Sequence, residues 1–125
     1  MSKYLNKKTE VDGILFDSKK EADYYGFLKQ KQELGEISNL RLQVPYEIIP
    51  AVYGTRVKHL KTKTKEEPYC VQRATYYYAD FVYIVTATGR QEVVDVKSKI
   101  TRKNPVYLLK KKLMLAMNGI DIIEV

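Results

Sequence analysis

A short valine run, VVDVKSK beginning at Val93, carries two charged side chains. β-Branched residues of this kind are typical of a buried strand, where a charge is costly unless something compensates it. Because side chains alternate along a strand, Asp95 and Lys97 share one face. An isolated Asp-x-Lys is most simply explained as an ion pair on a solvated face, so its meaning depends on what lies beside it.

A third charged residue, Asp80, lies in the preceding segment TYYYADFVYIV, whose aromatic and β-branched residues predict a second strand. The two segments are separated by a turn in TATGR. Folding about this turn sets Asp80 beside Asp95, and alternation places Asp80 on the same face as Val82. We therefore expect the two carboxylates and the Lys97 ammonium group to converge on adjacent strands.

Paired carboxylates beside a lysine suit phosphodiester cleavage. Asp80 and Asp95 offer the oxygen ligands that Mg²⁺ or Mn²⁺ prefers. A metal held there would activate water and neutralise the charge that develops on the phosphate. The Lys97 ammonium group can orient the water or stabilise the transition state, and it also reduces the repulsion between the two carboxylates.

Glu21 is a candidate third acid, contributed by a predicted helix. At 100° per residue, Tyr25 and Leu28 point in nearly the same direction as Glu21, so its side chain follows the apolar stripe toward the protein body. The alternative is structural, because Ser18-x-x-Glu21 has the spacing of a capping box, in which Glu21 closes on the backbone of Ser18. From the residues alone, both roles stay open.

The elements that must position these residues follow from periodicity and turn signals. A helix is predicted from Asp17 or Ser18 to about Leu34, where Gly35 ends it. A second helix is predicted to begin at Pro105 and to end at 118–119. Extended segments are predicted at 37–49, 75–85, 91–98 and, as a short buried strand, 120–125.

A helix between the last two strands makes a βαβ crossover, so we expect the final strand to run parallel to the strand of Asp95. The predicted fold class is α/β, with a mixed β-sheet built from an antiparallel meander and a βαβ crossover and flanked by helices. The length of 125 residues and the hydrophobic content of 45% predict a single domain spanning 1–125.

Composition also limits the compartment. No apolar run approaches the ~18–20 residues that span a bilayer. The N-terminal MSKYLNKKTE has no apolar stretch that could serve as a signal peptide. The single cysteine, Cys70, excludes an intramolecular disulfide and a cysteine-rich zinc site. We therefore expect a cytoplasmic protein without a membrane partner.

A formal net charge of +7 predicts a polyanionic partner. Basic residues form two blocks without an acid, at 55–65 and 97–112, and the first lies in a long basic hairpin arm predicted at about 53–75 with its tip near Thr62–Pro68. Since a basic surface also serves solubility, the clustering favours nucleic acid more than the net charge does. The candidate backbone-contacting residues are Arg56, Lys58, Lys61, Lys63, Lys99, Arg102 and Lys103.

Taken together, these segments resemble the PD-(D/E)XK nuclease superfamily over roughly 11–125. SKKEADYY is similar to the first-helix motif around Glu21, YADFVY to the segment with the metal-binding Asp80, and VVDVKSK to the segment with Asp95 and Lys97. NPVYLLKKKLMLAMNGIDIIEV resembles the helix and strand that follow in small phage-encoded, resolvase-like members. Ala79 replaces the usual proline and Ser98 a frequent glycine, and neither change removes a functional group.

The resemblance implies a restriction-endonuclease-like core and a Mg²⁺-dependent DNA endonuclease in which Glu21, Asp80 and Asp95 hold the metal. Lys97 is then the catalytic lysine, and Gln43 matches an auxiliary glutamine found in some members. Branched DNA such as a Holliday junction is a candidate substrate, and a junction resolvase would act as a homodimer because it cuts two symmetric strands.

Two other classes of function stay open from the sequence. The main alternative is a non-catalytic basic nucleic-acid-binding module on a nuclease-like fold, in which the acids are structural and the arm binds. A third is an interaction protein that only inherited the fold.

Overall fold

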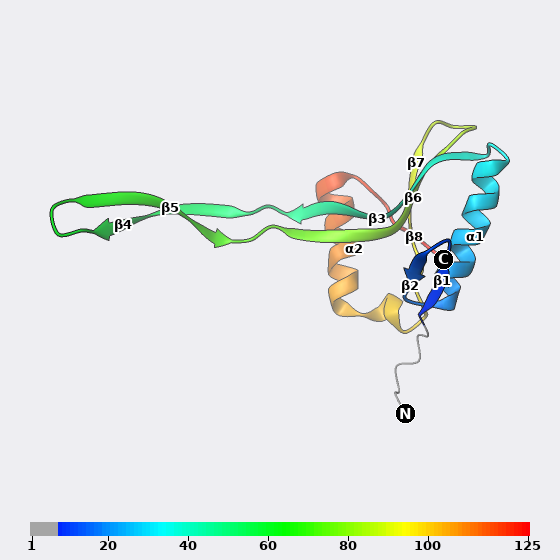
Figure 1. Ribbon diagram of the computed structural model, residues 1–125, viewed down its shortest axis with the longest axis horizontal. Coiled ribbons are helices and arrows are strands. Elements are labelled where there is room, and N and C mark those ends of the chain that lie inside the picture. The colour runs from blue at the N-terminus through cyan, green and yellow to red at the C-terminus, as the bar shows by residue number, and fades with distance from the viewer. Residues whose placement is uncertain (1–7) are drawn as a thin grey trace, which may run out of the picture.

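The computed structural model describes residues 8–125, so residues 1–7 of the predicted domain lie outside the described part. A central four-stranded sheet has the strand order β3-β6-β7-β8. Figure 1 shows the two helices on either side of it. The bounds are α1 Lys19–Glu33, β3 Ile37–Ile49, β6 Thr75–Val85, β7 Gln91–Asp95, α2 Pro105–Asn118 and β8 Ile123–Glu124. The predicted α/β class, a mixed sheet flanked by helices, is confirmed.

Strand direction follows the predicted topology. β6 pairs antiparallel with both β3 and β7, whereas β8 pairs parallel with β7 after the α2 crossover. β7 is shorter than predicted and ends at Asp95. The ladder nevertheless continues, because the Lys97 amide donates to the Val125 carbonyl at 3.0 Å and the Val125 amide to the Asp95 carbonyl at 3.0 Å. Lys97 is therefore held by the sheet although it lies beyond the strand.

Local capping explains where both helices begin and end. Ser18 caps α1, and its hydroxyl accepts from the Glu21 amide at 3.1 Å. Beyond the helix, Gly35 takes a φ of +77°, which is favourable for glycine and allows the chain to turn into β3. Asn104 caps α2, and Gly119 ends it with a φ of +65°. The helix limits predicted from the sequence are confirmed within a residue or two.

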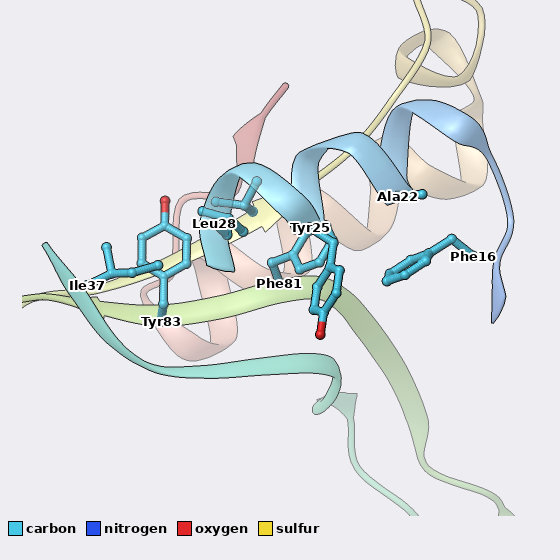
Figure 2. Packing of buried hydrophobic residues seen from close by; sticks show 8 residues of the cluster. Phe16, Ala22, Tyr25, Leu28, Ile37, Phe81 and Tyr83 are labelled. Atoms are coloured by element: carbon cyan, nitrogen blue, oxygen red, sulfur yellow. The ribbon is translucent and has the colours of Figure 1, made fainter. Parts of the chain in front are cut away.

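The two faces of the sheet carry separate hydrophobic clusters. Figure 2 shows α1 contributing Ala22, Tyr25 and Leu28 above the strand that bears Phe81 and Tyr83. On the opposite face, α2 packs through two buried side chains against β6 and β7. The residues of this second cluster include Tyr107, Met114, Tyr77, Ala79, Val82 and Val93.

Strict alternation does not hold along β6, which corrects one expectation. Ala79 and Val82 both belong to the α2 cluster although they lie three residues apart. An untwisted strand would place them on opposite faces, so β6 rotates between them, at Asp80. The change of face coincides with the end of the β6–β7 pairing beside Asp80, beyond which β6 is paired with β3 alone.

The predicted basic arm is a two-stranded hairpin that projects away from the sheet (Figure 1). It consists of β4, Val52–His59, and β5, Thr64–Gln72, which pair with each other and with no other strand of residues 8–125. The turn lies at 60–63, where the Leu60 amide donates to the Lys63 carbonyl at 2.8 Å. The predicted tip near Thr62–Pro68 is therefore too wide, because Pro68 lies within β5, a strand with one free edge that tolerates proline.

Three short elements complete the described chain. β1, Thr9–Val11, and β2, Ile14–Phe16, form a small hairpin that delivers the buried Phe16 ring to the α1 cluster. The basic loop after Lys97 contains a 3-10 turn, η1, at Thr101–Lys103. Neither α1 nor α2 is long and apolar enough to cross a membrane.

We predict that Asn104→Ala destabilises the protein by about 1 kcal/mol. The Asn104 side chain accepts from the amides of Val106 at 2.9 Å and Tyr107 at 3.2 Å, and alanine leaves both donors to water. The measurement is the free energy of unfolding from urea denaturation, with Lys112→Ala on the exposed side of α2 as the control. Equal unfolding free energies for the two variants would contradict the capping role.

Candidate functional site

The site is built on a row of residues across three neighbouring strands. The β3–β6 register sets Gln43 opposite Asp80. The β6–β7 register, continued by one residue past its last pair, sets Asp80 opposite Asp95. Both parts of the arrangement depend on strand pairing, which brings residues from distant parts of the chain to the same level of the sheet.

Asp80 sits at the fork where β7 separates from β6. One of its carboxylate oxygens, Oδ2, accepts from the Val96 amide at 2.9 Å. The other, Oδ1, accepts from the Gln43 side-chain amide at 3.0 Å. The carboxylate thus bonds to the chain beyond β7 where backbone pairing has stopped, and both of its oxygens are fixed. Gln43, named only as an auxiliary residue from the sequence, is one of its direct partners.

Glu21 reaches the same place from the first turn of α1. Its side chain is 8% exposed, and its Oε1 lies 3.5 Å from the Gln43 side-chain nitrogen. Ser18 caps the helix through the Glu21 amide, but among the described residues the Glu21 carboxylate makes no return bond to the Ser18 backbone. The carboxylate is therefore directed at Gln43 and Asp80, and only half of a capping box is formed.

Asp95 is the most deeply buried charged side chain of the site, at 1% exposed. Its Oδ2 lies 3.4 Å from the Lys97 ammonium nitrogen, yet it receives no hydrogen bond from any of the residues that the structure describes. A buried carboxylate oxygen without a donor is unfavourable in an isolated protein. The Lys97 ion pair and the nearby Tyr77 hydroxyl therefore compensate this carboxylate only in part.

Lys97 is positioned by groups that the sequence did not single out. Its ammonium nitrogen lies 5.0 Å from the centre of the Tyr107 ring, a cation–π arrangement. The Tyr107 hydroxyl donates to Glu124 at 3.0 Å, and Lys111 also donates to Glu124 at 2.8 Å. Behind the lysine, the Lys20 ammonium group donates to the Lys97 carbonyl at 3.2 Å. The α2 ring and its anchor therefore direct Lys97 toward Asp95.

Tyr77 is a second residue that sequence reasoning missed. Its buried hydroxyl has no hydrogen-bond partner among residues 8–125, and burial followed by the Asp95 charge raises the pKa of Tyr77 far above its ordinary value. Alternation around Asp80 assigned Tyr77 to the opposite face from Asp80. Only the rotation of β6 brings it near Asp95.

Burial and mutual repulsion shift the acids of the site. Burial, then the charges of Asp80, Asp17 and Asp95, raise the pKa of Glu21 to about 7. Burial, then Asp80, raise the pKa of Asp95 well above its usual range. Lys97 opposes both shifts without cancelling them. The group carries more negative charge than its protein neighbours neutralise, as is typical of functional carboxylate pairs.

A cavity of about 270 Å³ opens at Glu21, Asp80 and Lys97, whereas the buried Asp95 does not line it. A second hollow of about 350 Å³ shares Lys97 and Thr101 with it and extends along α2. The cavity is wide enough for water and part of a phosphate group. Its lining residues are Asp17, Ser18, Lys20, Glu21, Asp80, Val96, Lys97, Ser98 and Thr101.

The side chains predicted to contact phosphate differ in whether they already interact with other residues of the protein. Lys99 and Lys103 are exposed beside the cavity mouth. Arg102 is half-buried, and its Nε has no hydrogen-bond partner among the described residues. In the arm, Arg56 forms a 2.9 Å ion pair with Glu67.

Glu21, Asp80 and Asp95 are the residues of this site that could hold a divalent cation, since their carboxylate oxygens can act as metal ligands. Within residues 8–125, no three His, Cys, Asp or Glu side chains already form a closed ligand cluster. Gln43 lies between Glu21 and Asp80 and donates to both. Common coordination by the three acids would therefore require a side-chain adjustment at Gln43.

We predict that, with EDTA present, the stability of the protein falls as pH rises from about 5 to about 8. In the unfolded chain Glu21 ionises near 4.5, but in the folded protein it ionises near 7, so the folded state retains protons that the unfolded state has lost. Rising pH in this window therefore favours unfolding, by on the order of 2 kcal/mol. The measurement is urea denaturation across the window.

The pKa of Asp95 is also raised, so Asp95 contributes to the same pH dependence. Glu21→Gln removes one of the two titrations and should reduce the pH dependence, whereas Glu33→Gln, an exposed change at the end of α1, should leave it unchanged. If the stability of Glu21→Gln has the same pH dependence as that of the wild-type protein, the pKa of Glu21 is not raised in the folded state.

Comparison with known proteins gives a family but no activity. A search of curated proteins finds no match, and a search of solved structures finds none either. The model of one protein family matches residues 1–118, nearly the whole chain. The chain therefore belongs to the DUF1064 family, whose description is "Protein of unknown function".

Proposed function

We propose that this protein is a metal-dependent DNA endonuclease of the PD-(D/E)XK type. The observation that carries the proposal is the meeting of Glu21, Asp80 and Lys97 at one cavity, with the buried Asp95 carboxylate 3.4 Å from the Lys97 ammonium nitrogen. Residues up to 76 positions apart along the chain meet in the order of elements that the superfamily uses. Excess negative charge beside a lysine suits hydrolysis of a phosphodiester with a bound cation.

The residues present fit a hard divalent cation. The buried Asp95 oxygen without a donor and the raised pKa values of Glu21 and Asp95 are both relieved by positive charge. Mg²⁺ or Mn²⁺ would be held by Glu21, Asp80 and Asp95. When bound, the ion would supply Lewis acidity toward the attacking water and the scissile phosphate.

The protein's own groups have separable roles in this proposal. Lys97, directed by the Tyr107 ring, places a positive charge where a phosphate oxygen gains negative charge in the transition state. Gln43 and the Val96 amide keep the Asp80 carboxylate in position. Lys99 and Lys103 at the cavity mouth bind the DNA backbone, which positions the substrate without reading its sequence.

The proposed enzyme recognises the structure of its DNA substrate and not the base sequence. The reason is that neither helix of the described residues resembles a recognition helix that would enter the major groove. Four-way junctions are the leading candidate, in line with a phage-type enzyme of DNA recombination acting in the cytoplasm of a bacterial host. Action on a junction would require a homodimer.

One observation favours the alternative of a non-catalytic nucleic-acid-binding module. Gln43 donates to both Glu21 and Asp80, and a glutamine between two carboxylates can stabilise them without any metal. In that case the acids are structural and the basic surface is the whole function. The two proposals differ in whether DNA is cut.

We predict that the protein cuts DNA with Mg²⁺ or Mn²⁺ and that EDTA abolishes the cutting. Asp80→Ala and Lys97→Ala should each lower the cleavage rate by roughly 10²–10³-fold, because each removes a group that acts on the transition state. The assay compares labelled linear duplex, single strand, flap and four-way junction. DNA affinity, measured separately in EDTA, should change little.

Lys99→Ala is the matched control, since it removes an equal charge two residues from Lys97 but outside the cavity. It should weaken binding modestly and leave the rate at saturating DNA unchanged. Binding to every substrate without cutting, in the wild type as in both variants, would establish the non-catalytic module.

A direct test of the cation needs no substrate. Mg²⁺ at about tenfold its dissociation constant should stabilise the protein by about 1.4 kcal/mol, which raises the melting temperature by roughly 5 °C. Asp95→Asn should remove this shift, while Asp121→Asn, an exposed change outside the cavity, should retain it. A shift that survives Asp95→Asn would place the cation elsewhere.

A further inference from the structure

The free cations of the arm are concentrated at its distal end. The register sets Lys58 directly opposite Lys65, and the turn between their strands carries Lys61 and Lys63. All four side chains are exposed, and among the described residues none has a carboxylate within ion-pair distance. These four residues are the arm tip.

The middle of the arm is different. Arg56 is paired with Glu67 at 2.9 Å and lies 5.6 Å from the centre of the Tyr69 ring. Its charge is therefore already neutralised within the hairpin. Beyond this pair, toward the turn, the charged side chains that lack an ion pair include the four lysines of the arm tip.

Nothing in the fold benefits from the arm tip. Like charges directly opposite on two strands repel, and an isolated two-stranded hairpin is at best marginally stable. β4 and β5 are exposed along nearly their whole length and add no buried core. A hairpin that concentrates unpaired lysines far from the body fits a polyanionic partner better than it fits a structural role.

The distance of the arm tip from the carboxylate site is set by strand geometry. The pair Ile49 and Thr75 ends the β3–β6 ladder, and the pair Val52 and Gln72 begins the arm in the same register. The arm is therefore a continuation of the two strands that carry Gln43 and Asp80. Sixteen residues of largely extended chain separate Gln43 from His59, which at about 3.3 Å per residue reach up to about 50 Å.

We infer that the arm tip binds the backbone of duplex DNA at a point up to about 15 base pairs from the carboxylate site, since each base pair advances 3.4 Å. The contact of the same duplex with the carboxylate site rests on the proposed function, whereas the binding of DNA by the arm tip does not. A duplex of this length is stiff, so two contacts so far apart can be satisfied by one straight segment. A flexible single strand gains no such advantage.

The test is fluorescence anisotropy in EDTA with labelled duplexes of about 10 and about 30 base pairs. Lys58→Gln combined with Lys65→Gln should weaken binding to the long duplex roughly tenfold and lower the slope of log affinity against log salt by about 2. The short duplex should show little difference between variant and wild type, because it cannot reach the arm tip and the body together.

The quantity to compare is the ratio of wild-type to variant affinity at each length, because a long duplex offers more binding positions to any protein. Two controls isolate the arm tip. Arg56→Gln with Glu67→Gln alters the same hairpin at constant net charge, and Lys8→Gln with Lys112→Gln removes two exposed lysines from the body. Both controls should retain the length-dependent affinity, and circular dichroism checks that every variant is folded.

Equal affinity of the arm-tip variant and the wild type for the long duplex would overturn the inference. An equal loss in the body-lysine control would do the same, as would equally tight binding of single-stranded DNA or of RNA. If length dependence is found but no substrate is ever cut, the arm inference stands and the nuclease proposal fails. If the short duplex is cut at the full rate and the arm-tip variant has no effect on binding or cutting, the nuclease proposal stands and the arm inference fails.

Discussion

The arrangement of the site depends on one carboxylate, that of Asp80, at the point where β7 leaves β6. Its two oxygens accept from the Val96 amide and from Gln43, so it ties together three strands at one level. Strand register brings Asp95 to the neighbouring position, and α1 delivers Glu21 from the side. Because β6 rotates at Asp80, the same point also turns Tyr77 toward Asp95. A local change in pairing thus controls both the direction of the acids and the depth at which they are buried.

Electrostatic balance in this protein differs between the body and the arm. In the body, two lysines near the site are paired with acids. Lys97 lies 3.4 Å from Asp95 and packs on the Tyr107 ring, and Lys111 forms an ion pair with Glu124. Burial, followed by repulsion from Asp80, raises the pKa values of Glu21 and Asp95. The arm has the opposite imbalance, with unpaired ammonium groups at its end. The proposed cation site and the proposed DNA contact of the arm would each use one of these two opposite imbalances.

The fold could be predicted well because its signals are local. Capping residues, helix-ending glycines and runs of β-branched and aromatic residues gave both helices, β3 and β6 within a residue or two, whereas β7 and β8 are shorter than predicted. The crossover rule gave the parallel direction of β8. The errors have physical causes. Pro68 resembles a turn residue but is tolerated in a two-stranded arm, and the alternation rule failed at Asp80 because a strand that loses one partner can change its twist.

The sequence by itself determined which residue types are present and on which elements they lie: three acids, a lysine two residues beyond one of them, and two basic blocks. Tertiary structure decided which of these groups face one another. It directed the Glu21 carboxylate away from its own cap, placed Gln43 between two acids, gave Lys97 the Tyr107 ring, and neutralised Arg56 while leaving Lys58 and Lys65 free. Such choices depend on register and on the direction of long side chains, which are fixed by contacts between residues far apart in the chain and carry no signature in the local sequence.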